Sequence, residues 1–236
     1  MSLLRERLSV FSALLFFAVS LALALSALLT DFWIQADAMR RNGTESNKHQ
    51  MNSGLFHGIR QLDWTFGPKR KHFSVFDEIQ SDISFMDRNV WFALLLFTGL
   101  GLLWNFVGLS VTLRNSTKYG KDAKGKENLR QNDTAVGTLG ICLWGTLTIV
   151  SYGLSAALFL WQFFVRLRHN VLLPEHIEAG FSSDGCVVLG FSFWLLVNAV
   201  SAQLIPCILL FWALSGRGKR TAEEEKSKEQ DTVFLY

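Results

Sequence analysis

The chain contains almost no cysteine: three residues in 236, at positions 142, 186 and 207. The longest stretch between apolar runs, residues 30–89, has none, so a disulfide-stapled extracellular domain is excluded. We expect the thiols of Cys142 and Cys207 to be buried as small hydrophobic groups. Their S-acylation near the inner face of a membrane is the alternative.

Charged side chains are absent from four long apolar runs, residues 10–29, 90–113, 134–165 and 185–216. An α-helix rises about 1.5 Å per residue and a bilayer core is about 30 Å thick, so about 20 apolar residues are enough to cross it. The sequence therefore predicts an α-helical membrane protein with a four-helix transmembrane bundle. The first run is long for a signal peptide and lacks a clean cleavage site, which favours an uncleaved span.

Sequence signals of catalysis are missing as well. No Asp, Glu, His, Lys or Arg lies in the middle of a predicted span, whereas most ion pathways and proton relays need such a residue, and an intramembrane hydrolase would want a buried Asp pair, a His cluster or a Ser/His pair. There is no nucleotide-binding glycine motif, nucleophile elbow or HExxH motif, and His49, His57 and His72 lack metal-ligand spacing. We therefore expect no enzymatic activity, no metal and no cofactor. The net charge of +3 is small and its cations lie in loops, which predicts no nucleic-acid partner.

Lysine and arginine concentrate on one side of the predicted bundle. They occur in the N-terminal residues 1–9, in the short connection 114–133 and at the start of the tail, residues 217–236. The positive-inside rule makes this side cytosolic, although two arginines also follow the third run. We therefore expect a multi-pass plasma-membrane protein with both termini in the cytosol and residues 30–89 and 166–184 outside the cell.

Glycosylation sequons bear on this orientation. Asn42 begins an Asn-Gly-Thr sequon in the predicted outer loop, so we expect it to carry a glycan. The sequons that begin at Asn115 and Asn132 lie in the predicted cytosolic connection and are expected to stay unmodified. A glycan on Asn115 would contradict the orientation.

The predicted outer loop, residues 30–89, is rich in β-type residues and contains turn signals at Asn42-Gly43 and Gly67-Pro68. Residues 77–87 have the apolar spacing of a short amphipathic helix. The sequence thus predicts a small extracellular antiparallel β-sheet on the bundle. Its expected strands cover residues 32–36, 53–59, 62–66 and 72–76.

Polar and small residues interrupt the apolar runs. Asn105, Asn198 and Gln203 are expected to form interhelical hydrogen bonds; a substrate site is the alternative. Small residues at four-residue spacing predict close helix packing, and Pro206 predicts a kink. The small residues are Ala18, Ala22 and Ser26 in the first run and Gly153 and Ala157 in the third. Tryptophans near the span ends are expected to form an aromatic belt, namely Trp33, Trp91, Trp161 and Trp212.

Trp33 at the outer end of the first run, followed by Gly54-Leu55-Phe56, resembles the Trp…Gly-Leu-Trp pattern of claudin-type proteins. The two cysteines of that pattern are missing, which departs from claudins proper and argues against barrier formation. Further segments resemble the clarin family in order along nearly the whole chain. They are Gly54-Leu55-Phe56-His57-Gly58, residues 68–75, Gly140-Ile141-Cys142-Leu143-Trp144, Gly190-Phe191-Ser192-Phe193-Trp194-Leu195 and the hydrophobic C-terminal end.

The resemblance to clarins implies a claudin-like four-helix fold and a non-enzymatic organiser of the plasma membrane. It also implies links to the actin cytoskeleton or to junctional and synaptic complexes in sensory cells, such as hair cells and photoreceptors. The alternative function is that of an auxiliary subunit of a channel or transporter. A homo-oligomer stays open.

The tail, residues 217–236, is rich in Glu and Lys, a composition that predicts a solvated, mobile segment. It ends in hydrophobic residues, of which Phe234 and Tyr236 lie two positions apart. Such an end adds as a strand to a PDZ groove, which captures the carboxylate and both side chains. We therefore expect PDZ-containing scaffold proteins as partners besides the lipid bilayer. An accidental hydrophobic end is the alternative.

Overall fold

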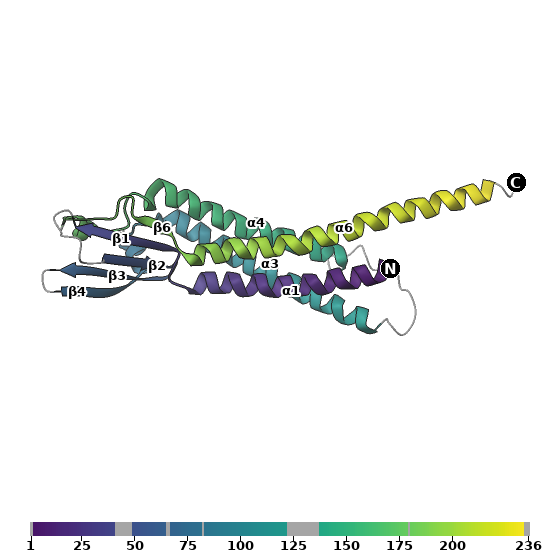
Figure 1. The fold of residues 1–236 in the computed structure, drawn as a ribbon, viewed down its shortest axis with the longest axis horizontal. Coiled ribbons are helices and arrows are strands. Elements are labelled where there is room, and N and C mark those ends of the chain that lie inside the picture. The colour runs from purple at the N-terminus through teal and green to yellow at the C-terminus, as the bar shows by residue number, and fades with distance from the viewer. Residues whose placement is uncertain are drawn as a thin grey trace.

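The computed structural model describes residues 2–40, 49–64, 67–81, 83–121, 137–178 and 180–233. Within these residues, four helices are long and apolar enough to cross a membrane. They lie side by side as a bundle, and a small sheet covers one end of it (Figure 1). The helices are α1 (Ser2–Leu29), α3 (Arg88–Lys121), α4 (Thr138–Gln162) and α6 (Phe191–Val233). α1 begins and α6 ends at the end opposite the sheet.

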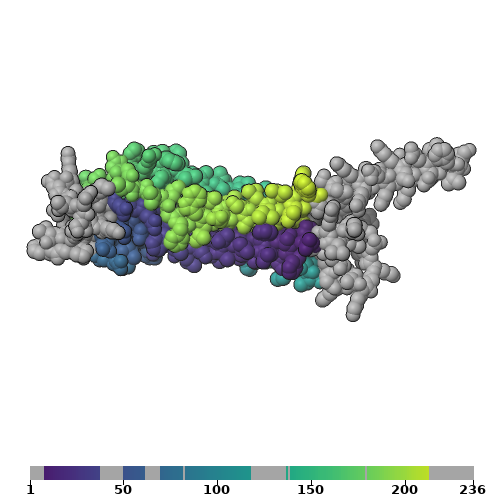
Figure 2. Space-filling view, in the orientation of Figure 1, coloured from purple at the N-terminus to yellow at the C-terminus, as the bar shows by residue number. Residues whose placement is uncertain are grey.

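Each long helix buries a stripe of residues spaced alternately by three and four positions. This is the seven-residue spacing of coiled coils, which keeps one face of a helix against its neighbours. α1 packs against α6 and α3, and α4 packs against α3 and α6, so the four helices close into a ring. α1 and α6 run next to each other along one face (Figure 2). In α3 the stripe is Leu94, Thr98, Gly101, Asn105, Gly108 and Thr112, and in α4 it is Ile141, Gly145, Thr148, Tyr152, Ser155 and Phe159.

Two glycines of the α3 stripe allow large rings into the centre of the bundle. A Cβ atom at Gly108 would lie 2.2 Å from a ring carbon of Phe17, and one at Gly101 would lie 2.4 Å from the ring of Tyr152. Both rings are fully buried. The glycines therefore let α1 and α4 pack their aromatic side chains directly on the backbone of α3.

The small residues that were expected to pack between helices lie on the outside of the bundle. Ala18, Ala22 and Ser26 are exposed on α1, and Ala157 is exposed on α4. A Cβ atom at Gly153 would meet nothing within 4 Å. The packing prediction is wrong at these positions. Four-residue spacing occurs on more than one face of a helix, and the faces that carry larger side chains fill the interior of the bundle.

Within the described part of the chain, the sheet has six strands, all paired antiparallel, in the order β4-β3-β2-β1-β5, and β6 also pairs with β1. Ile34 of β1 pairs with Ser53 of β2 on one side and with Leu189 of β6 on the other. The two connections at this end of the bundle therefore form one sheet. The strands are β1 (Ile34–Arg40), β2 (His49–Ser53), β3 (His57–Trp64), β4 (Gly67–Ser74), β5 (Phe181–Ser182) and β6 (Val187–Leu189).

Among the described residues, three short helical segments lie between the sheet and the bundle: α2 (Val75–Gln80), the π-helical η2 (Phe163–Leu167) and α5 (Pro174–Glu178). α2 begins earlier and ends earlier than the helix expected over residues 77–87. The reason for its start is local: Ser74 caps the helix, because its hydroxyl accepts a hydrogen bond from the N–H of Asp77 (3.4 Å).

The expected strand boundaries are partly wrong. The strand expected over residues 53–59 contains the turn between β2 and β3, where the N–H of Gly54 donates to the carbonyl of His57 (2.8 Å). Gly67 and Pro68, expected to form a turn, begin β4, and Gly67 pairs with Trp64. The intervening residues 65–66 lie outside the described part of the chain.

The fourth apolar run contains a strand as well as a helix. Its expected span began at residue 185, but β6 precedes α6, which begins at Phe191. A side chain is excluded at Gly190, where a Cβ atom would lie 2.0 Å from the carbonyl oxygen of Phe32. The N–H of Gly190 donates to the carbonyl of Trp33 (2.9 Å). An uncharged run does not by itself distinguish a buried strand from the start of a helix.

Helices continue beyond the apolar runs at the opposite end of the bundle. α3 reaches Lys121, inside the expected basic connection 114–133, and α6 reaches Val233, through most of the tail that was expected to be mobile. Glu and Lys are good helix formers, so a charged composition does not exclude a helix.

Candidate functional site

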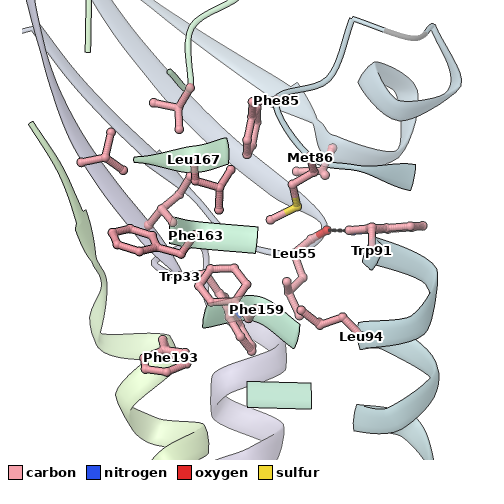
Figure 3. Close-up of a cluster of buried hydrophobic side chains, with 14 of the residues drawn as sticks. Trp33, Leu55, Phe85, Met86, Trp91, Leu94, Phe159, Phe163, Leu167 and Phe193 are labelled. Carbon is pink, nitrogen blue, oxygen red and sulfur yellow. Dashed lines mark hydrogen bonds between the residues drawn. The ribbon is translucent and has the colours of Figure 1, made fainter. Parts of the chain in front are cut away.

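The sheet is fixed to the bundle by a cluster of large buried side chains (Figure 3). Trp33 donates from Nε1 to the carbonyl of Ala27 (2.7 Å), and its ring packs edge-to-face on Phe159 with the centroids 4.8 Å apart. Trp91 donates from Nε1 to the carbonyl of Leu55 (2.8 Å). Both indole rings are buried. Each tryptophan therefore ties an end of a helix to the chain around it while filling the junction.

This placement corrects part of the expected aromatic belt. Trp33 and Trp91 point into the protein, whereas Trp161 and Trp212 are 56% and 77% exposed on the outside of the bundle. The position of a tryptophan near a helix end does not determine the direction in which it points. Only the last two are placed to meet the surroundings of the bundle.

The Gly54-Leu55-Phe56 segment lies at the same junction. A Cβ atom at Gly54 would lie 2.8 Å from Cα of Asp31, so the turn between β2 and β3 sits directly on the chain that leaves α1. Leu55 is fully buried, and the carbonyl of Phe56 accepts from the N–H of Val75 at the start of α2 (2.8 Å). The segment thus joins three elements through its backbone.

A buried ion pair connects the sheet to α2. Arg60 on β3 binds both carboxylate oxygens of Glu78, with Nη2 at 2.8 Å from Oε2. Arg60 is 3% exposed and Glu78 is 7% exposed. The guanidinium carbon lies 3.8 Å from the ring centroid of Phe73 and 5.9 Å from that of Phe85. Pairing and stacking of this kind offset the cost of removing a cation from water.

His176 on α5 lies in the field of this pair. Burial lowers the pKa of His176 from its ordinary value of 6.5, and the charge of Arg60 lowers the pKa further. Lys71 of β4 acts in the same direction, whereas Glu175 and Glu78 raise the pKa. The charges of Arg60 and Glu78 in the first connection therefore act on a histidine of the second connection.

The sequence did not single out these three residues. Strand alternation does place Arg60 on the opposite face from Ile59 and Gln61. Nothing in the sequence shows which of the two faces is buried, because that depends on α2 and α5 folding back on the sheet. A charged residue in a loop is normally solvated, which makes the buried pair unexpected.

Asn105 makes the interhelical contact expected of it. Its amide nitrogen donates to Oγ of Ser20 (3.1 Å), and Ser20 donates to the carbonyl of Ala199 (2.9 Å). These residues come from α3, α1 and α6, so two consecutive hydrogen bonds link three of the four long helices.

Asn198 and Gln203 behave differently from Asn105. Asn198 is exposed and donates to the carbonyl of Trp194 in its own helix (2.8 Å), so the expected interhelical bond is wrong for this residue. Its side chain faces away from the bundle, and its own helix supplies the nearest acceptor. Gln203 is fully buried and faces Gly145 of α4, yet neither amide atom has a hydrogen-bond partner among the described residues.

Three predicted site residues, Asn42, Phe234 and Tyr236, lie outside the described residues. The glycosylation and PDZ predictions therefore stay predictions. Within the described ranges, no three or more His, Cys, Asp or Glu side chains gather in a way that could hold a metal ion. The three cysteines are free thiols, and Cys142 and Cys207 are half-buried.

The described chain thus offers two features for function: a sheet with a buried charged cluster, and a long helix that leaves the opposite end of the bundle. No known family profile matches this chain, and no characterised protein is significantly similar to it in sequence. What the protein does must therefore be inferred from its own residues and geometry.

Proposed function

We propose that this protein is a four-span plasma-membrane protein of the clarin type that organises scaffold complexes without catalysing a reaction. It holds the sheet outside the cell and α6 in the cytosol, and it connects the membrane to cytoskeletal, junctional or synaptic scaffolds. One observation carries the proposal: both connections at one end of the bundle form a single sheet, while α6 extends from the other end.

The surface of the bundle supports a location in lipid. Large apolar side chains are exposed on all four long helices, for example Phe11, Phe106, Leu143 and Trp194. A bundle in water would leave only small apolar patches uncovered, whereas lipid tails cover such a surface without cost. The basic residues at the end opposite the sheet then favour a cytosolic location for that end.

The interior of the bundle supports an organiser more than a transporter. Phe17 and Tyr152 fill its centre, and the polar contacts around Asn105 join helix to helix. A substrate or ion pathway would need polar groups that face an open route. The two ends of the molecule are therefore the parts that we assign to recognition.

Glycosylation mapping tests the orientation. We expect Asn42→Gln to remove a glycan and to increase the electrophoretic mobility of the protein made in cells. Asn115→Gln is the matched control and leaves the mobility unchanged. Two results would reverse the proposed orientation. The first is a mobility shift with Asn115→Gln. The second is an unchanged mobility with Asn42→Gln although deglycosylation increases the mobility of the parent protein.

Proximity labelling tests the scaffold function. A biotin ligase fused to the N-terminus lies at the same end of the bundle as the tail and leaves the C-terminal carboxylate free. We expect labelling of PDZ-containing and actin-linked proteins, and a loss of the PDZ proteins with the double substitution Phe234→Ala and Tyr236→Ala. Leu235→Ala is the matched control, because an added strand directs this side chain away from the groove.

Two outcomes contradict the proposal. Unchanged labelling with the double substitution removes the PDZ interaction. A stoichiometric channel or transporter in the purified complex, together with altered currents, establishes the alternative role of an auxiliary subunit instead.

A further inference from the structure

The strand β4 is an edge strand of the sheet. Among the described strands it pairs only with β3, from His57 opposite Ser74 to Trp64 opposite Gly67. Figure 1 shows β4 on the outer side of the sheet. The free edge of such a strand presents backbone N–H and C=O groups that can hydrogen-bond to another extended chain.

β4 is also the most basic strand of the sheet, with Lys69, Arg70, Lys71 and His72 in succession. The side chains of Arg70, Lys71 and His72 are exposed. Successive side chains of a strand point to opposite faces, so both faces of the edge carry positive charge. Lysine on an edge strand commonly prevents indiscriminate pairing with other strands. A strand that pairs with this edge must therefore carry negative charges that complement its cations.

We propose that the free edge of β4 binds an extended, acidic segment of a partner protein as an added antiparallel or parallel strand. The backbone of the segment hydrogen-bonds to the edge, and its carboxylates pair with cations on both faces. This interaction concerns the sheet alone, and it goes beyond the scaffold function assigned to the tail.

The same charges argue against a second copy of this chain as the occupant. Pairing of two β4 edges would place Lys and Arg side chains directly opposite one another, and like charges in such positions are destabilising. A polyanionic sugar is less well matched, because it does not use backbone groups and would meet only one face of the strand.

The surface of the protein's own membrane is also a poor match. The bundle end of β4 lies near Ser74, since the next residue, Val75, donates to the carbonyl of Phe56 at the junction. Arg70 lies four residues further along the strand, or about 13 Å at the usual rise of about 3.3 Å per residue. That distance exceeds a Debye length of about 8 Å, so attraction to headgroups at the bundle end is largely screened.

The full-length protein in phosphatidylcholine nanodiscs tests this proposal. The probe is a fluorescent peptide, Thr-Val-Glu-Glu-Glu-Val-Thr, whose binding is followed by fluorescence anisotropy. We expect the double substitution Arg70→Gln and Lys71→Gln to weaken binding by at least about fivefold, because each exposed ion pair contributes up to about one factor of five. Arg88→Gln with Arg168→Gln removes exposed cations elsewhere at this end of the molecule and leaves the affinity unchanged.

Variation of the peptide separates strand addition from simple charge attraction and does not depend on the folding of a variant. The same peptide with N-methylated amides keeps its charge but cannot hydrogen-bond to an edge. We expect it to bind at least about tenfold more weakly than the parent peptide, which corresponds to the loss of a few hydrogen bonds.

Three results overturn the proposal. The first is equal binding of the parent and N-methylated peptides. The second is an unchanged affinity of the double variant for the parent peptide. The third is tighter binding of a heparin oligosaccharide that depends on the same two residues, which would assign the edge to polyanionic sugars.

Discussion

At the scale of single residues, the buried pair of Arg60 and Glu78 is the most consequential feature of the sheet. The pair is held between β3 and α2, with aromatic rings on the guanidinium. Glu78→Gln leaves the cation in a site that is 3% exposed, so we expect a loss of about 3–5 kcal/mol in the free energy of unfolding of the sheet. Urea denaturation followed by the intrinsic tryptophan fluorescence of the parent and variant proteins measures this loss.

Replacing both residues of the ion pair shows whether the unpaired buried charge, and not the loss of the ion pair itself, destabilises the sheet. Arg60→Met with Glu78→Leu removes both charges and keeps most of the volume, and we expect a loss of less than about 1.5 kcal/mol or a gain in stability. If the double variant is as unstable as Glu78→Gln, then the unpaired charge is not the cause of the loss.

His176 gives the sheet a dependence on pH. Its pKa in the folded protein is below 6.5, so the unfolded chain takes up a proton first as the pH falls. The stability that neutral His176 contributes is present above pH 6.5 and is lost as the pH drops from 6.5 towards the folded pKa. We expect the denaturation midpoint to fall between about pH 7.5 and pH 5.5 and to fall less in His176→Gln.

His169 provides the matched control for this measurement. Its side chain is 71% exposed and lies 3.9 Å from Asp184. His169→Gln therefore controls for the removal of an exposed imidazole at the same end of the molecule. A pH dependence that disappears in both variants, or in neither, removes His176 as the responsible group.

At the scale of elements, the polar contact around Asn105 ties the helices of the bundle together. Asn105→Leu removes the bond to Ser20, and we expect the unfolding free energy of the bundle to fall by about 0.6–2 kcal/mol. Asn198→Leu is the comparison, because Asn198 bonds only within α6 and faces outward. It should leave the stability unchanged or raise it.

Titration of the nanodisc-free protein with sodium dodecyl sulfate, followed by circular dichroism, measures both substitutions under one set of conditions. Equal losses of unfolding free energy for Asn105→Leu and Asn198→Leu would show that the outward face of α6 also makes a stabilising contact. That result would favour an oligomer joined through α6.

At the scale of the whole molecule, the sheet joins two connections that are far apart in the sequence. Gln35 of β1 pairs with Val188 of β6. Cysteines at such directly opposed positions of antiparallel strands lie within the range of Cα distances that a disulfide bridges. We therefore expect Gln35→Cys with Val188→Cys to crosslink the two connections in a chain whose natural cysteines are replaced by serine.

A protease site inserted within residues 122–136 makes the crosslink visible. After cleavage, the two halves should migrate as one band in sodium dodecyl sulfate without reductant and as two bands with it. Each single cysteine variant is the control and gives two bands in both cases. Two bands from the oxidised double variant would contradict the pairing of β1 with β6.

The sequence alone was enough to establish the four long helices and the presence of a small sheet. Both depend on local properties: an uncharged apolar run favours a helix of that length, and β-type residues between turn signals favour strands. The same local properties misplaced boundaries where two elements share one composition. The apolar strand β6 was merged with α6, and the charged end of α6 was taken for a mobile tail.

Tertiary structure alone decided which side of each element faces inward. It buried Phe17 and exposed Ala18, turned Trp33 and Trp91 into the junction, and gave Asn105 a partner on another helix while leaving Asn198 outside. It also paired Arg60 with Glu78 and placed His176 within the influence of their charges. The physical reason is that orientation depends on the neighbours an element packs against, and those neighbours come from distant parts of the chain that composition and periodicity do not connect.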